Sequence, residues 1–148
     1  MEIKKYPALP EGFSEAVRIE DHSDLSTLTI LIQDSVGGLQ AFNIENDEWI
    51  DIPALPKVLV NSGDFLRDLS AGFIPSTRHR VVATPENRLD RTSCVFFVSP
   101  NWHSQIEPLC ARSSSENLSQ ESAVARTISC ENARYDFEPY LAGDRMPA

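Results

Sequence analysis

The chain has 148 residues, of which 41% are hydrophobic and 24% are charged, a balance that fits one globular domain and excludes a disordered protein. Its net charge of −9 at pH 7 argues against a nucleic-acid partner and an anionic membrane surface, because both need concentrated Lys and Arg. No apolar run approaches the ~18 residues of a membrane span, and the first residues lack the apolar stretch of a signal peptide.

Short strand patterns separated by turn residues follow one another from residue 2 to residue 99. In chain order they cover residues 2–6, 16–19, 27–33, 39–42, 49–52, 58–60, 79–83 and 91–99. Residues 65–70 fit one or two helical turns, Gly37-Gly38 fits a turn with positive φ, and Trp49 is expected in the core. About eight closely spaced strands with almost no helix predict an all-β core built as a sandwich, barrel or jelly roll.

The composition changes after Pro100. Residues 111–134 are rich in Ser, Glu and Asn and predict a flexible Ser-rich loop. Residues 135–148 contain enough aromatic and apolar side chains to dock a short segment on the domain. We therefore divide the chain into a folded domain at 1–110, the loop at 111–134 and a C-terminal docking segment at 135–148.

The last predicted strand is apolar on both faces towards its end. Strand alternation places its side chains in two sets, Arg91, Ser93, Val95 and Phe97 on one face and Thr92, Cys94, Phe96 and Val98 on the other. A strand of this kind is typically covered on both sides. We expect the interior of the sheet structure on one side and a separate covering element on the other.

The three cysteines are an odd number without metal-site spacing, at Cys94, Cys110 and Cys130. We interpret them as free thiols in a reducing compartment. Together with the missing signal-peptide pattern, they predict a cytoplasmic protein.

His22 and Asp24 are two residues apart, so in an extended chain their side chains point the same way. One imidazole and one carboxylate from this segment, with a second imidazole from elsewhere, make the facial triad that holds Fe(II) and leaves open positions. His79 is the best third ligand, because the remaining histidine, His103, follows the last strand. Arg91 and Ser93 share one strand face, where the guanidinium fork and the hydroxyl could clamp a carboxylate.

These residues belong to a longer set of motifs in which the chain resembles the isopenicillin N synthase-like branch of the 2-oxoglutarate/Fe(II) oxygenases. The resemblance covers roughly residues 4–109 and keeps the order and spacing of that family. The matching segments are Tyr6-Pro7, His22-Ser23-Asp24, 28–34, 37–40, 49–53, Asn61-Ser62-Gly63-Asp64, His79-Arg80-Val81 and Arg91-Thr92-Ser93.

The resemblance implies a double-stranded β-helix, or jelly roll, of about eight strands with a short C-terminal helical segment. It implies that His22, Asp24 and His79 bind Fe(II), and that Arg91 and Ser93, assisted by Tyr6, hold the distal carboxylate of 2-oxoglutarate. The enzyme it implies is a dioxygenase that uses O2 to hydroxylate, desaturate or ring-modify a small molecule, with release of succinate and CO2. Residues 91–97 are similar to those of microbial cephalosporin ring-expanding enzymes, which suggests secondary metabolism.

The chain departs from the family in two ways. It starts almost on the first jelly-roll strand, without the usual N-terminal helical region, and it carries Lys4 where the family usually has Asn. We therefore expect self-association, a partner chain that supplies the missing helices, or a fragment cut from a longer enzyme. Two alternatives stay open: a truncated homologue that acts as a non-catalytic or partner-dependent subunit, and an iron oxidase of the same family that does not use 2-oxoglutarate.

Overall fold

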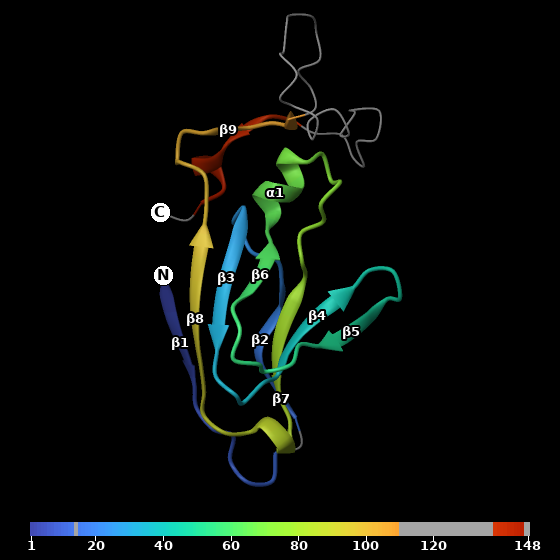
Figure 1. The fold of residues 1–148 in the computed structure, drawn as a ribbon, viewed down its shortest axis with the longest axis vertical. Coiled ribbons are helices and arrows are strands. Elements are labelled where there is room, and N and C mark those ends of the chain that lie inside the picture. Colours follow the sequence, from blue (N-terminus) through green and yellow to red (C-terminus); the bar gives the residue numbers. More distant parts are fainter. Residues whose placement is uncertain (14, 110–137, 147–148) are drawn as a thin grey trace, which may run out of the picture.

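The computed structural model describes residues 1–13, 15–109 and 138–146, and its core is two four-stranded sheets that face each other (Figure 1). The first sheet has the order β1 (Glu2–Tyr6), β8 (Arg91–Val98), β3 (Leu28–Gln33), β6 (Leu59–Ser62). The second has the order β2 (Ala16–His22), β7 (His79–Ala83), β4 (Leu39–Asn43), β5 (Glu48–Asp51). All neighbouring strands are antiparallel, and the chain crosses repeatedly between the sheets. The predicted all-β jelly roll is confirmed.

β2 is longer than predicted, because it continues beyond Ile19 to His22. The polar residues Glu20 and Asp21 resemble the start of a turn, but pairing with β7 keeps the chain extended as far as the His22–His79 pair. Two register shifts lie along this pairing, between Val17 and Ile19 and between Ile19 and His22. The irregular register is a tertiary effect that the local pattern of β2 does not contain.

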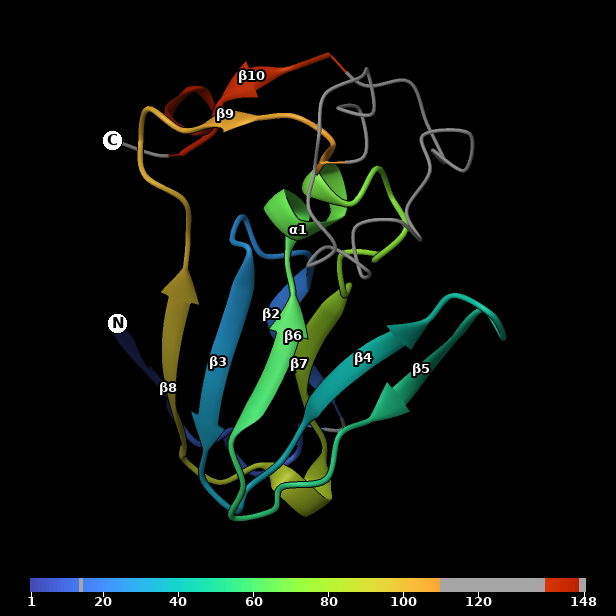
Figure 2. The same ribbon diagram turned by 45° about the horizontal axis from the view of Figure 1, so that its top comes forward.

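One end of the sandwich is closed by α1 (Asp64–Leu69) beneath β9 (Gln105–Ile106), β10 (Tyr140–Leu141) and the 3₁₀ turn η4 (Ala142–Asp144) (Figure 2). Phe65, Ile106 and Ala142 form a fully buried cluster there. A further 3₁₀ turn, η1 (Pro85–Asn87), precedes β8. The predicted loop at 111–134 lies outside the described residues, as do Cys110, Cys130 and part of the predicted docking segment. No helix among the described residues is long and apolar enough to cross a membrane.

The tight turn before β4 depends on two glycines. Gly37 and Gly38 have φ values of 85° and 86°, which is the left-handed region. A Cβ atom on Gly38 would collide with the carbonyl oxygen of Val82. The glycines therefore allow β4 to begin directly against β7.

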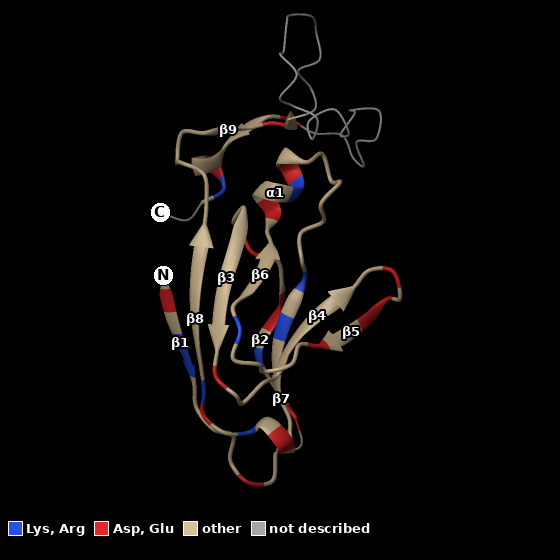
Figure 3. Ribbon diagram, in the orientation of Figure 1, with Lys and Arg blue, Asp and Glu red and all other residues tan. Residues whose placement is uncertain are grey.

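The outward side of the first sheet, which we call the outer face, is apolar and open to solvent. Figure 3 shows β3, β6 and most of β8 without charged residues. Phe96 pairs with Ile30, which in turn pairs with Val60, so one apolar row crosses three strands. The exposed fractions of the outer-face side chains are Ile3 64%, Ile32 53%, Val60 60%, Phe96 49% and Val98 38%. No described residue covers this face, so the expectation that both sides of the last strand are covered stays a prediction.

Candidate active site

The three candidate metal ligands come together where β2 and β7 meet. His22 ends β2, His79 begins β7, and the two are paired across the sheet. Asp24 lies just beyond β2 and is 7% exposed. Its Oδ1 is 3.7 Å from the Nε2 of His22 and 3.7 Å from the Nε2 of His79. One ligand atom from each residue lies within 4.8 Å of the others, which is a separation suited to a single ion.

Backbone carbonyls fix the orientation of both imidazoles. The Nδ1 of His22 lies 2.7 Å from the carbonyl oxygen of Glu20, and the Nδ1 of His79 lies 2.9 Å from that of Thr77. A carbonyl oxygen only accepts hydrogen bonds, so each neutral imidazole carries its proton on Nδ1 and turns the Nε2 lone pair towards Asp24. Two lone pairs that face a carboxylate oxygen repel it unless a cation lies between them. The donor set therefore fits a divalent metal bound on one face by two imidazoles and a carboxylate.

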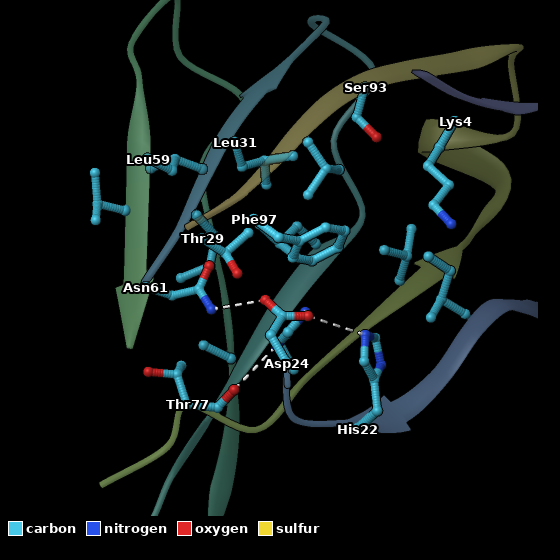
Figure 4. A pocket seen from close by; sticks show the side chains of 18 of the residues that line it. Lys4, His22, Asp24, Thr29, Leu31, Leu59, Asn61, Thr77, Ser93 and Phe97 are labelled. Carbon is cyan, nitrogen blue, oxygen red and sulfur yellow. Dashed lines mark hydrogen bonds and ion pairs between the residues drawn. The ribbon is translucent and has the colours of Figure 1, made fainter. Parts of the chain in front are cut away.

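A polar side chain from β6 holds the other oxygen of Asp24. The Nδ2 of Asn61 donates to Asp24 Oδ2 over 3.0 Å, as Figure 4 shows. The two oxygens of the Asp24 carboxylate thus have different neighbours. Oδ1 faces the two histidines, and Oδ2 accepts a hydrogen bond from Asn61. The sequence contains this residue in the matching segment at 61–64, but its role was not predicted, because the contact depends on how β6 lies beside the His22–Asp24 turn.

The residues after Asn61 also contact the turn that contains Ser23 and Asp24. The backbone N–H of Asp64 donates to the carbonyl oxygen of Asp24 over 2.9 Å. Ser23 Oγ donates to Asp64 Oδ1 over 3.0 Å. A Cβ atom on Gly63 would lie 2.7 Å from the same carbonyl oxygen, so only glycine allows this close approach. Residues 61–64 therefore fix both the backbone and the carboxylate of the predicted metal-binding motif.

The metal-ligand cluster opens into a cavity of about 430 Å³ between the sheets, within the size range of small-molecule sites. Both sheets contribute apolar walls, among them Ile19, Leu31, Leu39, Val81, Val95 and Phe97. Arg91, Ser93, Tyr6 and Lys4 also line the cavity. All six site residues predicted from the sequence thus border one space.

Arg91 is almost completely buried, with an exposed fraction of 1%. Its Nε donates to the carbonyl oxygen of Gly37 over 3.0 Å, its Nη2 to Gln33 Oε1 over 2.9 Å and its Nη1 to Ser93 Oγ over 3.3 Å. Burial lowers the pKa of the guanidinium below its ordinary value, while Tyr6 and Asp34 oppose this shift. Arg91 remains a cation even when buried, because a guanidinium is not deprotonated in proteins.

The bonds to Gly37, Gln33 and Ser93 use one N–H of each guanidinium nitrogen, and Tyr6 also forms a side-chain hydrogen bond with the guanidinium. The Tyr6 ring lies beneath the guanidinium, with 5.2 Å between the Arg91 Cζ and the ring centroid. Gln33, 8% exposed, was not predicted, although strand alternation places it on the cavity face of β3. The result is a fixed fork suited to a carboxylate.

Comparisons with known proteins agree with this arrangement. The model of the 2OG-Fe(II) oxygenase superfamily matches residues 1–100. Feruloyl CoA ortho-hydroxylase F6H1-1 from Ipomoea batatas is 41% identical over 105 residues, which are 70% of this chain and 28% of that protein. Gibberellin 2-beta-dioxygenase 7 from Arabidopsis thaliana is 43% identical over 108 residues, 72% of this chain and 31% of that protein.

Among solved structures, a full-length Neurospora crassa protein in complex with alpha-KG superposes with a TM-score of 0.73 at 31% identity. The match covers 96% of this chain and 41% of that one. The chain therefore spans less than half of each of these relatives, and under a third of the two plant proteins.

Proposed function

Because the chain belongs to the 2OG-Fe(II) oxygenase superfamily, we propose that it is the catalytic jelly roll of an Fe(II)- and 2-oxoglutarate-dependent dioxygenase that oxidises a small molecule and releases succinate and CO2. The observation that carries this proposal is a single cavity lined by His22, Asp24 and His79 and by the Arg91–Ser93 pair. A metal centre and a carboxylate fork in one apolar space are what the cosubstrate requires.

In this proposal His22, Asp24 and His79 hold Fe(II), which with bound 2-oxoglutarate supplies the activation of O2. Arg91 and Ser93 bind the distal carboxylate of 2-oxoglutarate, and Tyr6 supports the guanidinium from below. Burial of Arg91 strengthens its attraction for a carboxylate, because little water competes there. The apolar walls limit the space in which water can hydrogen-bond beside the reacting groups.

The matched relatives favour a small-molecule substrate of no single class. The names of the two plant proteins refer to feruloyl CoA and to gibberellin, and the Neurospora crassa protein has also been solved with thymine. A cytoplasmic location and a role in secondary metabolism remain proposals that rest on the sequence patterns alone.

The ratio of succinate formed to O2 consumed tests the proposed reaction. We expect the chain to form one succinate for each O2 in the presence of Fe(II), 2-oxoglutarate and a substrate from a small-molecule screen. O2 consumption without succinate would instead indicate an iron oxidase that does not use 2-oxoglutarate. Metal binding without any turnover would indicate a non-catalytic or partner-dependent subunit.

Asn61 gives a prediction about metal binding. We expect Asn61→Ala to weaken Mn²⁺ binding by about 10–100-fold, the usual effect of losing a partner that orients a metal ligand. Without the amide, Asp24 Oδ2 loses its fixed donor and the carboxylate can rotate. Calorimetric titration measures the effect, with Asn46→Ala in the exposed turn between β4 and β5 as the matched control. Equal Mn²⁺ affinity in both variants would remove the role of Asn61.

We further propose that the outer face is covered in the working protein, by a second copy of the chain, by another polypeptide or by a further part of a longer chain. Its five exposed side chains form one apolar patch, and large patches of this kind are rare on soluble monomers. Burial contributes about 25 cal/mol per Å² of apolar surface, so covering the patch drives association.

We therefore expect light scattering to show concentration-dependent association of the isolated chain, and Phe96→Lys to reduce it, because the substitution places a charge in the patch. Lys5→Glu, which exchanges one exposed charge for another, serves as the control. A monomer at every concentration, without binding of a hydrophobic dye, would contradict the proposal.

A further inference from the structure

With Fe(II) and 2-oxoglutarate bound as proposed above, the groups in the cavity carry more positive than negative charge. Among the described residues that line it, Lys4 and Arg91 are cations and Asp24 is the acid. The charge of Fe(II) is balanced by the two carboxylates of 2-oxoglutarate, and Asp24 balances one of the two cations. One positive charge is left among the groups that line the cavity, whose walls are otherwise mostly apolar; its present counter-charge is Glu2, which does not line the cavity. An anionic group on the second ligand would neutralise it.

Lys4 is the cation without an assigned role. β1 pairs with β8 so that Lys4 lies opposite Ser93 and Tyr6 lies opposite Arg91. Strand alternation therefore puts Lys4 and Tyr6 on the cavity face and turns Lys5 outwards. Figure 4 shows the Lys4 side chain beside Ser93 on the wall of the same pocket that contains His22 and Asp24.

Lys4 now forms an ion pair with Glu2, which a ligand carboxylate could replace. Its Nζ lies 2.7 Å from Glu2 Oε2, and the two side chains are 44% and 51% exposed. The hydrogen bond that Lys4 donates to Glu2 raises the pKa of the Lys4 ammonium, which is thus fully charged at neutral pH. Exposed ion pairs of this kind contribute little to stability, so a ligand carboxylate can replace Glu2 at low cost.

We propose that Lys4 binds a carboxylate inside the cavity and thereby selects an organic acid as the substrate of this enzyme. The inference rests on the proposed function, since it takes the metal centre and the Arg91 fork as already occupied. A carboxylate could come from the substrate or from 2-oxoglutarate itself. The charge balance favours the substrate, because Arg91 and the metal already account for both carboxylates of 2-oxoglutarate.

The test compares Lys4→Met with Lys5→Met, a matched variant one residue along the strand whose side chain faces outwards. Calorimetric titration first measures 2-oxoglutarate binding to the Mn²⁺-loaded chain. The chain saturated with Mn²⁺ and 2-oxoglutarate is then titrated with pairs of acids and their amides, beginning with benzoate and benzamide. Thermal unfolding of both metal-free variants checks that each one folds.

We expect the wild type and Lys5→Met to bind acids more tightly than amides, by roughly tenfold for one charge-assisted hydrogen bond. Lys4→Met should lose this preference. A loss confined to 2-oxoglutarate would assign the carboxylate to the cosubstrate instead. If Lys4→Met leaves every affinity unchanged, or if no acid binds better than its amide, the inference is overturned. Failure of the wild type to bind 2-oxoglutarate at all would instead count against the proposed function, so the two failures are distinguishable.

Discussion

Replacement of His79 by Ala is expected to abolish most metal binding and all turnover. The substitution removes one of the three donors around Asp24 and leaves the metal with one imidazole and one carboxylate oxygen. Loss of a direct ligand costs more than loss of an orienting partner, so we expect Fe(II) affinity to fall by more than ~100-fold. The iron content of the purified variant, measured under anaerobic conditions with added Fe(II), gives the answer.

His103→Ala is the matched control for this experiment. His103 is exposed in the segment that follows β8 and is not a member of the metal-ligand cluster. Its replacement should leave the iron content unchanged. One iron per chain in His79→Ala would mean that the cluster is not the metal site.

Arg91→Lys is expected to weaken 2-oxoglutarate binding strongly while metal binding persists. A lysine ammonium is a point charge and cannot reproduce the fork that Gly37, Gln33 and Ser93 hold in place. Each charge-assisted hydrogen bond contributes about 1.5–3 kcal/mol, and up to two are lost. At about 1.4 kcal/mol per tenfold change, affinity should fall by at least about tenfold.

The control for Arg91 is Arg88→Lys, because Arg88 is 41% exposed and forms a long ion pair with Glu11 at 3.6 Å. Calorimetric titration of both variants in the presence of Mn²⁺ compares their 2-oxoglutarate affinities. Should Arg91→Lys bind 2-oxoglutarate as tightly as Arg88→Lys does, Arg91 is not the clamp.

The local sequence pattern was sufficient to predict most of the strands and the candidate metal ligands. β7 covers the predicted residues 79–83, and the predicted jelly roll and oxygenase family are both confirmed. Strand alternation also placed Arg91 and Ser93 on one face, because the side-chain period of two is a local property of β8.

Features that depend on packing between distant segments were missed. Asn61 and Gln33 became part of the site only through the positions of β6 and β3 in the folded sheet. Trp49, predicted in the core, is only half-buried on the β4–β5 hairpin, where it packs edge-on against Phe42 and under the guanidinium of Arg80. Its apolar ring is covered by a cation rather than by a second layer, which composition alone does not indicate.

The central claim is that one cavity holds Fe(II) and 2-oxoglutarate together, and titration of 2-oxoglutarate into the chain with and without Mn²⁺ tests it most directly. Mn²⁺ replaces Fe(II) because both suit imidazole and carboxylate ligands and Mn²⁺ is less easily oxidised in air. We predict one 2-oxoglutarate per chain when Mn²⁺ is bound, and much weaker binding without the metal, because the Arg91 fork then acts alone. Equal binding with and without Mn²⁺, or no binding in either case, would contradict the claim.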